Sequence, residues 1–276
     1  MTRLRLLFLA PSAVLLAVLL AAPIAIVAVS SALTRGTYGG LGLPWTIENY
    51  ARLLDPLYAW ILLRSAALAG AATLLCLLVG FPMALFLTRA GRRRNLCLCL
   101  VMLPFWTSFL VRTYAWMFLL RDTGLVNTVL QSVGLIRDPL PLLYNDGAVV
   151  LGLVYGYLPF MILPIYAALE RLDPSLAEAS ADLGARPWTT VTLVLAPLAW
   201  PGILAGCLLV FIPCLGAYLT PDLLGGGKSV MVGNLVQNQF TNARDWPFGS
   251  AVSVALLALV MLLLLTLLRR RAEELL

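Results

Sequence analysis

The sequence contains no histidine, and only 12% of its 276 residues are charged. A soluble domain carries about 25% charged residues, so this chain has too few charges to cover a water-exposed surface when 61% of its residues are hydrophobic. The lack of histidine removes the commonest general base and metal ligand. The composition therefore argues against a soluble enzyme and indicates that lipid surrounds much of the chain.

Acidic residues are missing from the long apolar runs, because every Asp and Glu lies between the runs or at their ends. A carrier driven by protons or sodium usually buries such a group at the membrane midplane, and a membrane enzyme needs a nucleophile beside a base. The chain therefore favours transport powered by another polypeptide. A self-contained secondary carrier or channel stays an alternative, since backbone carbonyls could hold sodium.

Neither the cysteines nor the basic residues indicate a metal site or a nucleic-acid site. The five cysteines fall within apolar runs, without the spacing of a metal site or the loop positions of a disulfide framework. We therefore expect them to pack in the core and expect no metal. The net charge of +6 would suggest nucleic acid in a soluble protein, but most arginines flank apolar runs, where they orient a chain in the membrane.

Six apolar runs are long enough to cross a bilayer, which takes roughly 20 residues. They predict one all-α transmembrane domain over residues 1–276, with spans at about 7–30, 65–87, 96–119, 149–169, 198–219 and 248–268. The first run exceeds the roughly 7–15 apolar residues of a signal peptide, so we expect it to be a retained helix. Gly202 and Gly206 give the fifth span the GxxxG spacing of close helix contacts.

Arginine clusters set the expected orientation. Arg92–Arg94 and Arg269–Arg271 would lie on the same side as the N-terminus, and such clusters mark cytoplasmic loops. This predicts a multi-pass protein of the bacterial inner membrane with both termini in the cytoplasm. The outer loops would be long, and one of them would hold a short interfacial helix at 124–135.

The largest cytoplasmic loop is predicted at 170–197, and it contains a helix of its own. Asp173 can cap a helix that begins at Pro174, and Gly184 can end it. Glu178 and Asp182 stand one turn apart, where like charges repel, so a basic partner surface would stabilise them. From the residues alone, a partner-docking helix and a plain connection between two spans are equally supported.

The loop resembles the EAA loop of ABC importer permeases, whose pattern is Glu-Ala-Ala, three residues, Gly, nine residues and Ile-x-Leu-Pro. The matching segments here are Glu178-Ala179-Ser180, Gly184 and Val194-Leu195-Ala196-Pro197. Ser180, Val194 and Ala196 depart from the pattern, each by a small or conservative change. The resemblance implies the type I importer permease fold and a coupling helix that docks on a cytoplasmic ATPase. It assigns ATPase coupling to Glu178, Ala179, Ser180, Asp182, Gly184 and Pro197.

Other segments are similar to the first permease of spermidine/putrescine transporters. They are Thr46–Tyr50, Leu103–Ser108, Tyr157–Met161, Asp222–Gly227 and Arg244–Pro247. The resemblance implies a non-enzymatic permease subunit for polyamines, with ferric ion, thiamine or phosphonate as alternative solutes. It also implies a homologous second permease, two copies of an ATPase that binds ATP and Mg²⁺, a periplasmic binding protein and surrounding membrane lipid. No cofactor in this chain and no nucleic acid are expected.

Aromatic side chains in the outer halves of the spans are candidates for a cation pathway, because aromatic faces attract cations. The aromatic candidates are Trp106, Tyr114, Tyr155, Tyr157 and Tyr218. Two charged residues are added to them: Arg112, the one charge inside a span, and Asp222, a carboxylate at the outer end of a span. Membrane-interface anchoring and core packing remain alternatives for the aromatics, and snorkelling to the headgroups remains one for Arg112. Gly227-Lys228-Ser229 resembles the end of a phosphate-binding loop but lacks its first glycine, which is Asp222 here. We therefore expect a turn.

Overall fold

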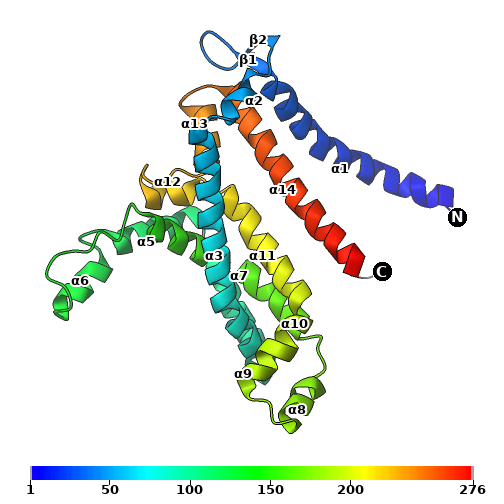
Figure 1. The fold of residues 1–276 in the computed structure, drawn as a ribbon, viewed down its shortest axis with the longest axis vertical. Coiled ribbons are helices and arrows are strands. Elements are labelled where there is room, and N and C mark those ends of the chain that lie inside the picture. Colours follow the sequence, from blue (N-terminus) through cyan, green and yellow to red (C-terminus); the bar gives the residue numbers. More distant parts are fainter. Residues whose placement is uncertain (1, 275–276) are drawn as a thin grey trace. The chain divides into compact units, whose positions relative to one another are not determined.

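The computed structural model describes residues 2–274, and within them the chain is helical apart from one β-hairpin (Figure 1). It forms two compact units, one of Met1–Trp60 with Leu235–Leu276 and one of Ile61–Asn234. The single transmembrane domain expected over 1–276 stays a prediction.

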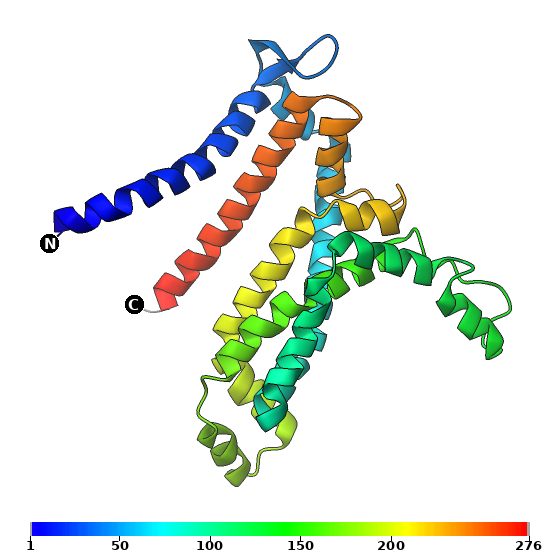
Figure 2. The ribbon, with the colours of Figure 1, turned by 180° about the vertical axis from the view of Figure 1, so that it is seen from behind.

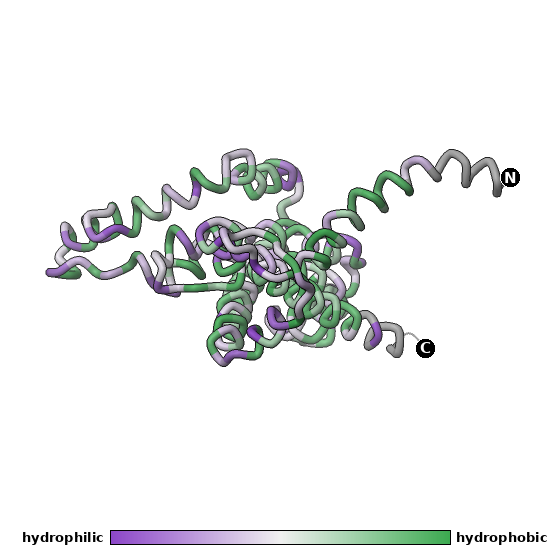
Figure 3. Tube along the Cα trace, turned by 90° about the horizontal axis from the view of Figure 1, so that it is seen from above, coloured by the Kyte–Doolittle hydropathy of each residue, from purple (hydrophilic) through white to green (hydrophobic). Residues whose placement is uncertain are grey.

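Four helices of the described residues are long and apolar enough to cross a membrane: Val14–Ser31 in α1 (Thr2–Ser31), α3 (Pro56–Arg89), α7 (Asp146–Leu169) and Trp246–Leu267 in α14 (Trp246–Glu274). Two further pairs pass the same test but are bent, Gly91–Trp106 with Phe109–Ser132 by 87° and Pro187–Leu198 with Trp200–Leu215 by 74°. The predicted six spans are reached when each bent pair counts as one. Hydrophilic residues gather mostly in the connections and at helix ends (Figure 3).

In the first unit, α1 and α14 pack against each other. Between α1 and α2 (Glu48–Leu53) stands an antiparallel hairpin of β1 (Leu33–Arg35) and β2 (Leu41–Trp45), which the sequence analysis did not predict. Buried Asn49 explains its position, because its side-chain amide donates to the carbonyls of Ser31 and Leu33 at 2.9 and 2.8 Å. Arg52 on α2 pairs with Asp245 at 2.9 Å, which ties α2 to the start of α14.

In the second unit, α7 and α11 (Trp200–Leu215) run side by side (Figure 2). The predicted GxxxG contact is present, because a Cβ on Gly202 would meet Ala168 Cβ at 2.5 Å and one on Gly206 would meet Met161 Sδ at 2.8 Å. A Cβ on Gly80 of α3 would meet Met161 Cγ of α7 at 3.1 Å. Small residues therefore let the backbones of three helices approach closely.

The third predicted span is not one straight helix. It consists of η1 (Gly91–Arg93), α4 (Arg94–Met102), a 3₁₀ turn η2 (Leu103–Trp106) and α5 (Phe109–Leu120), with Thr107 extended at φ −97° and ψ 150°. Pro104 lacks an N–H and its ring clashes with a continuing α-helix, which accounts for the change from α4 to η2, and the extended Thr107 then separates η2 from α5. The segment predicted to span the membrane at 96–119 is therefore interrupted in its middle.

Shorter helices complete the unit. After α5 comes α6 (Leu125–Ser132), inside the interfacial helix predicted at 124–135. The 170–197 loop contains α8 (Ser175–Asp182), α9 (Pro187–Thr190), the π-helical segment η3 (Val191–Leu195) and the start of α10 (Ala196–Leu198). Beyond α11 lie α12 (Leu219–Gly225) and α13 (Val232–Thr241), of which α13 runs into the first unit.

Candidate functional sites

Helix α8 starts one residue later than predicted, but its expected cap is present. Asp173 Oδ1 accepts a hydrogen bond of 2.9 Å from the backbone N–H of Ser175. This bond, with a further one to the Ser175 side chain, holds the pKa of the Asp173 carboxyl below its ordinary value, because both favour the charged form. Glu178 lies in the first turn, where the helix dipole favours a negative charge.

Gly184 ends α8 in a left-handed conformation with φ +81°. Its N–H donates to Ala181 O at 2.9 Å, and the next N–H, of Ala185, donates back to Ser180 O at 3.1 Å. Nothing lies within 4 Å of a Cβ built on Gly184. Glycine is therefore needed here for its backbone freedom and not for space.

Ser180 and Thr190 join α8 to α9 through their side chains. The two hydroxyl oxygens are 2.9 Å apart and both residues are buried. Thr190 Oγ1 also lies 3.5 Å from Arg186 O. From the sequence, Ser180 was only a small residue of the loop pattern. Its hydrogen bond could not be predicted, because the partner, Thr190, lies ten residues away on a separate helix.

The rest of α8 presents an uncovered surface within this chain. Glu178, Ala179 and Asp182 are exposed, and Leu183 is 88% exposed just after the helix. Trp188, at the start of α9, is 76% exposed. Large exposed apolar side chains with polar residues around them mark a surface that binds a partner protein. Pro197, the last predicted coupling residue, lies in α10 before the 74° bend.

Arg112 of α5 lies among aromatic rings that come from η2, α5 and α7. Its guanidinium carbon is 5.2, 5.6 and 6.0 Å from the ring centres of Phe105, Phe109 and Tyr155. Its Nε and Nη1 atoms are buried and without a hydrogen-bond partner among the described residues. Because the chain bends by 87° before Arg112, the position of this residue in the sequence does not give its depth in a membrane.

The remaining pathway candidates do not form one site, because they line two separate cavities or neither of them. Tyr157 and Tyr218 line one cavity of about 270 Å³ together with Phe109. Tyr155 contacts Trp116 edge-on at 5.5 Å, and both line a second cavity that includes Asp146. Three candidates line neither cavity and are exposed: Trp106, Tyr114 and Asp222.

One polar cluster was not anticipated from the sequence. Asp146, the first residue of α7, accepts a hydrogen bond from Arg64 of α3 at 2.7 Å and another from the Ser229 hydroxyl. The Gly227-Lys228-Ser229 segment is a turn, as predicted, with Gly226 and Gly227 at positive φ. It serves to bring Ser229 to Asp146. The partners lie more than 80 positions apart, so no local pattern could have shown the cluster.

Known proteins resemble this chain in sequence over most of its length. The family model described as "Binding-protein-dependent transport system inner membrane component" matches residues 77–274. The spermidine/putrescine transport system permease protein PotB of Haemophilus influenzae is 46% identical over 235 residues, 85% of this chain and 82% of that protein. PotB of Escherichia coli K12 is 44% identical, with 86% of each chain covered.

Solved structures resemble it in fold. A chain of a bacterial ABC transporter that imports the acidic polysaccharide alginate superposes with a TM-score of 0.70 at 20% identity, over 97% of this chain and 95% of that one. A chain of the MetNI methionine ABC transporter superposes with a TM-score of 0.55 at 20% identity, over 77% and 95%. The predicted fold class of an ABC importer permease is confirmed.

Proposed function

The chain belongs to the binding-protein-dependent transport system inner membrane component family, and from this premise we propose that it is a permease subunit of an ATP-driven importer of polyamines. The observation that supports the substrate class is the 44–46% identity to spermidine/putrescine permeases over more than four fifths of the chain. Ferric ion, thiamine and phosphonate remain the alternative solutes. The family places this multi-pass protein in an inner membrane.

In this proposal, α8 is the coupling helix. Its exposed Glu178, Ala179 and Asp182 dock on a cytoplasmic ATPase, and Gly184 lets the chain turn back toward the membrane. The left-handed end at Gly184 and the hydroxyl contact between Ser180 and Thr190 hold α8 against α9. Movement of α8 would therefore move α9 as well, and α9 leads through η3 and α10 into α11.

The partners in this proposal are a homologous second permease, two copies of an ABC ATPase and a periplasmic binding protein. Among the structural neighbours, an alginate transporter was solved with its periplasmic protein bound, which supports a partner of this kind. ATP and Mg²⁺ would bind the ATPase, and this chain would hold no cofactor. Helix α8 and both termini would face the cytoplasm, in keeping with the arginine clusters at 92–94 and 269–271.

In this proposal, transport depends on a difference between the inward-facing and outward-facing states in how they bind the ATPase pair. ATP binding closes the two ATPases on each other, and the two permeases switch from an inward-facing to an outward-facing path. The switch works only if the two states differ in their contacts with the ATPase pair, and the α8 surface would supply that difference. The ring cluster around Arg112 and the cavity of Tyr157 and Tyr218 would border the path of the cation.

The decisive experiment is reconstitution of the purified complex in proteoliposomes. We expect the binding protein to stimulate ATP hydrolysis several-fold with putrescine or spermidine, and to do so less with ferric ion, thiamine or phosphonate. Stimulation by one of the other solutes alone would overturn the substrate assignment. Uptake by liposomes that contain this chain without an ATPase would instead support the secondary carrier.

A further inference from the structure

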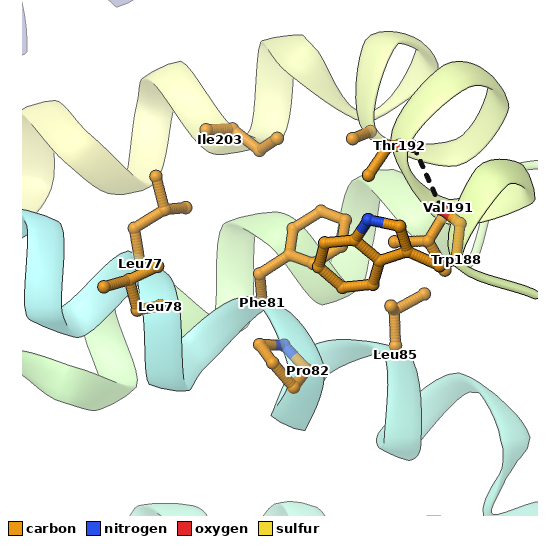
Figure 4. A pocket seen from close by; sticks show the side chains of 10 residues that line it. Leu77, Leu78, Phe81, Pro82, Leu85, Trp188, Val191, Thr192 and Ile203 are labelled. Carbon is orange, nitrogen blue, oxygen red and sulfur yellow. Dashed lines mark hydrogen bonds between the residues drawn. The ribbon is translucent and has the colours of Figure 1, made fainter.

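An apolar groove of about 360 Å³ lies beside the second helix of the 170–197 loop. Figure 4 shows side chains of α3 in its wall, of which Phe81 and Leu85 lie beside Trp188 and Leu78 lines the groove farther along the helix. Ala196 and Ile203 complete the lining. The groove therefore lies between a membrane-spanning helix and the segment that follows α8.

The wall offers almost nothing to a polar ligand. Its one side-chain hydroxyl, of Thr192, already donates to Trp188 O at 3.0 Å. An apolar cavity of roughly 150 Å³ stays dry and accepts small hydrocarbons, and this groove is larger. Leu78 is 60% exposed and Trp188 76% exposed, so the mouth is open. Its chemistry fits a hydrocarbon chain.

Basic residues follow the groove-lining residues along α3 and η1. Arg89 follows Leu85 by four residues on α3, so the two share a helix face. Arg92 and Arg93 come next and are exposed. Among the residues that the structure describes, no carboxylate pairs with these three arginines, and the nearby Glu170 is bound by Arg94.

The spacing matches one leaflet of a bilayer. Leu78 and Arg89 stand eleven positions apart on a continuous helix, which is about 16 Å along its axis. Half of a hydrocarbon core of roughly 30 Å is about the same length. A phosphate at Arg89 would thus place its acyl chain along the groove.

We propose that this groove binds one anionic phospholipid of the surrounding membrane, with an acyl chain against Phe81, Leu85 and Trp188 and the phosphate at Arg89, Arg92 and Arg93. Basic pockets between membrane helices bind acidic headgroups in this way. Because Trp188 and the π-helical η3 form the opposite wall, the lipid would brace the segment that connects α8 to α11. This inference goes beyond the proposed function and does not depend on the solute.

The test is native mass spectrometry of the full chain, purified in mild detergent with its co-purifying subunits and titrated with phosphatidylglycerol or phosphatidylcholine. We expect wild type to retain one phosphatidylglycerol and to prefer it over phosphatidylcholine by about fivefold for each arginine engaged. Ala196→Leu should reduce the binding of both lipids several-fold, since it fills the groove. Leu is the residue of the family pattern at this position, so the variant should fold.

Arg89→Gln should reduce the preference for phosphatidylglycerol over phosphatidylcholine about fivefold. The matched controls are Ala67→Leu, at an exposed position of α3 outside the groove, and Arg137→Gln, at an exposed arginine far along the chain. Both controls should bind like wild type. The proposal is overturned if wild type retains no lipid. That result is expected if a helix of a partner protein fills the groove. The proposal is also overturned if Ala196→Leu and Arg89→Gln bind like their controls.

Discussion

The hydroxyl groups of Ser180 and Thr190 lie 2.9 Å apart in a buried contact between α8 and α9. This contact joins the helix with the exposed carboxylates to the segment that leads back into α11. Because the carboxylate surface of α8 is itself exposed, its position relative to α9 depends on few internal contacts. A hydrogen bond at this junction therefore has more influence on the loop than it would have in a packed core.

Removing either hydroxyl should loosen the junction. Ser180→Ala leaves Thr190 with only its long contact to Arg186 O, and Thr190→Val leaves Ser180 unpaired, so we expect each to lower the free energy of unfolding by about 1 kcal/mol. The double variant should cost less than the sum, with a coupling energy of about 0.5–1.5 kcal/mol. Denaturant unfolding of the detergent-purified chain measures all three. Additive effects would mean that the hydroxyls do not interact.

Glu178→Arg and Gly184→Pro should leave the protein inserted in the membrane but abolish uptake. The first places a positive charge where a basic partner surface is expected, and the second forbids the φ of +81° at the end of α8. Uptake and membrane content are measured in the same cells. Glu48→Arg is the matched control, since Glu48 is also an exposed glutamate in the first turn of a short helix. Full uptake by either loop variant contradicts the docking assignment.

Arg112→Gln should lower the KM for putrescine several-fold with a smaller change in the maximal rate. A fixed positive charge beside a cation pathway opposes the entering cation, and removing it reduces that repulsion. Uptake kinetics in proteoliposomes provide the measurement. Arg121→Gln serves as control, because Arg121 also stands over a ring, Phe118, at 5.3 Å but outside the cluster around Arg112. An unchanged KM would remove Arg112 from the pathway.

The ion pair of Arg64 and Asp146 should contribute modestly to stability. Their side chains are 29% and 45% exposed, so solvent screens the pair, and Arg64→Gln is expected to cost about 0.5–1 kcal/mol. The exchanged variant, Arg64→Asp with Asp146→Arg, should recover part of that loss. Recovery is limited because the Ser229 hydroxyl donates to Asp146 and loses that acceptor. Thermal unfolding compares the variants, and equal stability of all of them would show that the pair contributes nothing.

Asp173 should act as a cap in its charged form. Its pKa is lowered in the folded state by the hydrogen bonds of Ser175, so its contribution is present above the unfolded pKa of about 3.9 and is lost as the pH falls through the lower folded value. At neutral pH, Asp173→Asn should couple ATP hydrolysis nearly as well as wild type, because the side-chain oxygen of Asn can accept the same hydrogen bond from the Ser175 N–H. Asp173→Ala should couple less well. ATPase assays at pH 7 test the series, and an equal loss in both variants would refute the capping role.

Much of this protein could be read from the order of its residues. Apolar runs of more than 20 residues predict spans because lipid offers no partner to an exposed backbone. Asp173 and Gly184 predict the ends of α8 because capping and left-handed turns are local chemistry. The loop pattern around Glu178 identified the family because its signature lies within 20 residues of continuous sequence.

Tertiary structure decided what depends on distant partners. The bend before Arg112, the aromatic rings around it, the cluster of Arg64 with Asp146 and Ser229, and the groove beside Trp188 each combine residues from separate helices or from a broken one. The hydropathy of a segment shows only whether the segment prefers lipid. A straight helix and a kinked helix of the same composition have the same hydropathy, so hydropathy does not reveal the bend. Side-chain contacts depend on helix rotation and crossing geometry, which packing determines and a linear pattern does not record.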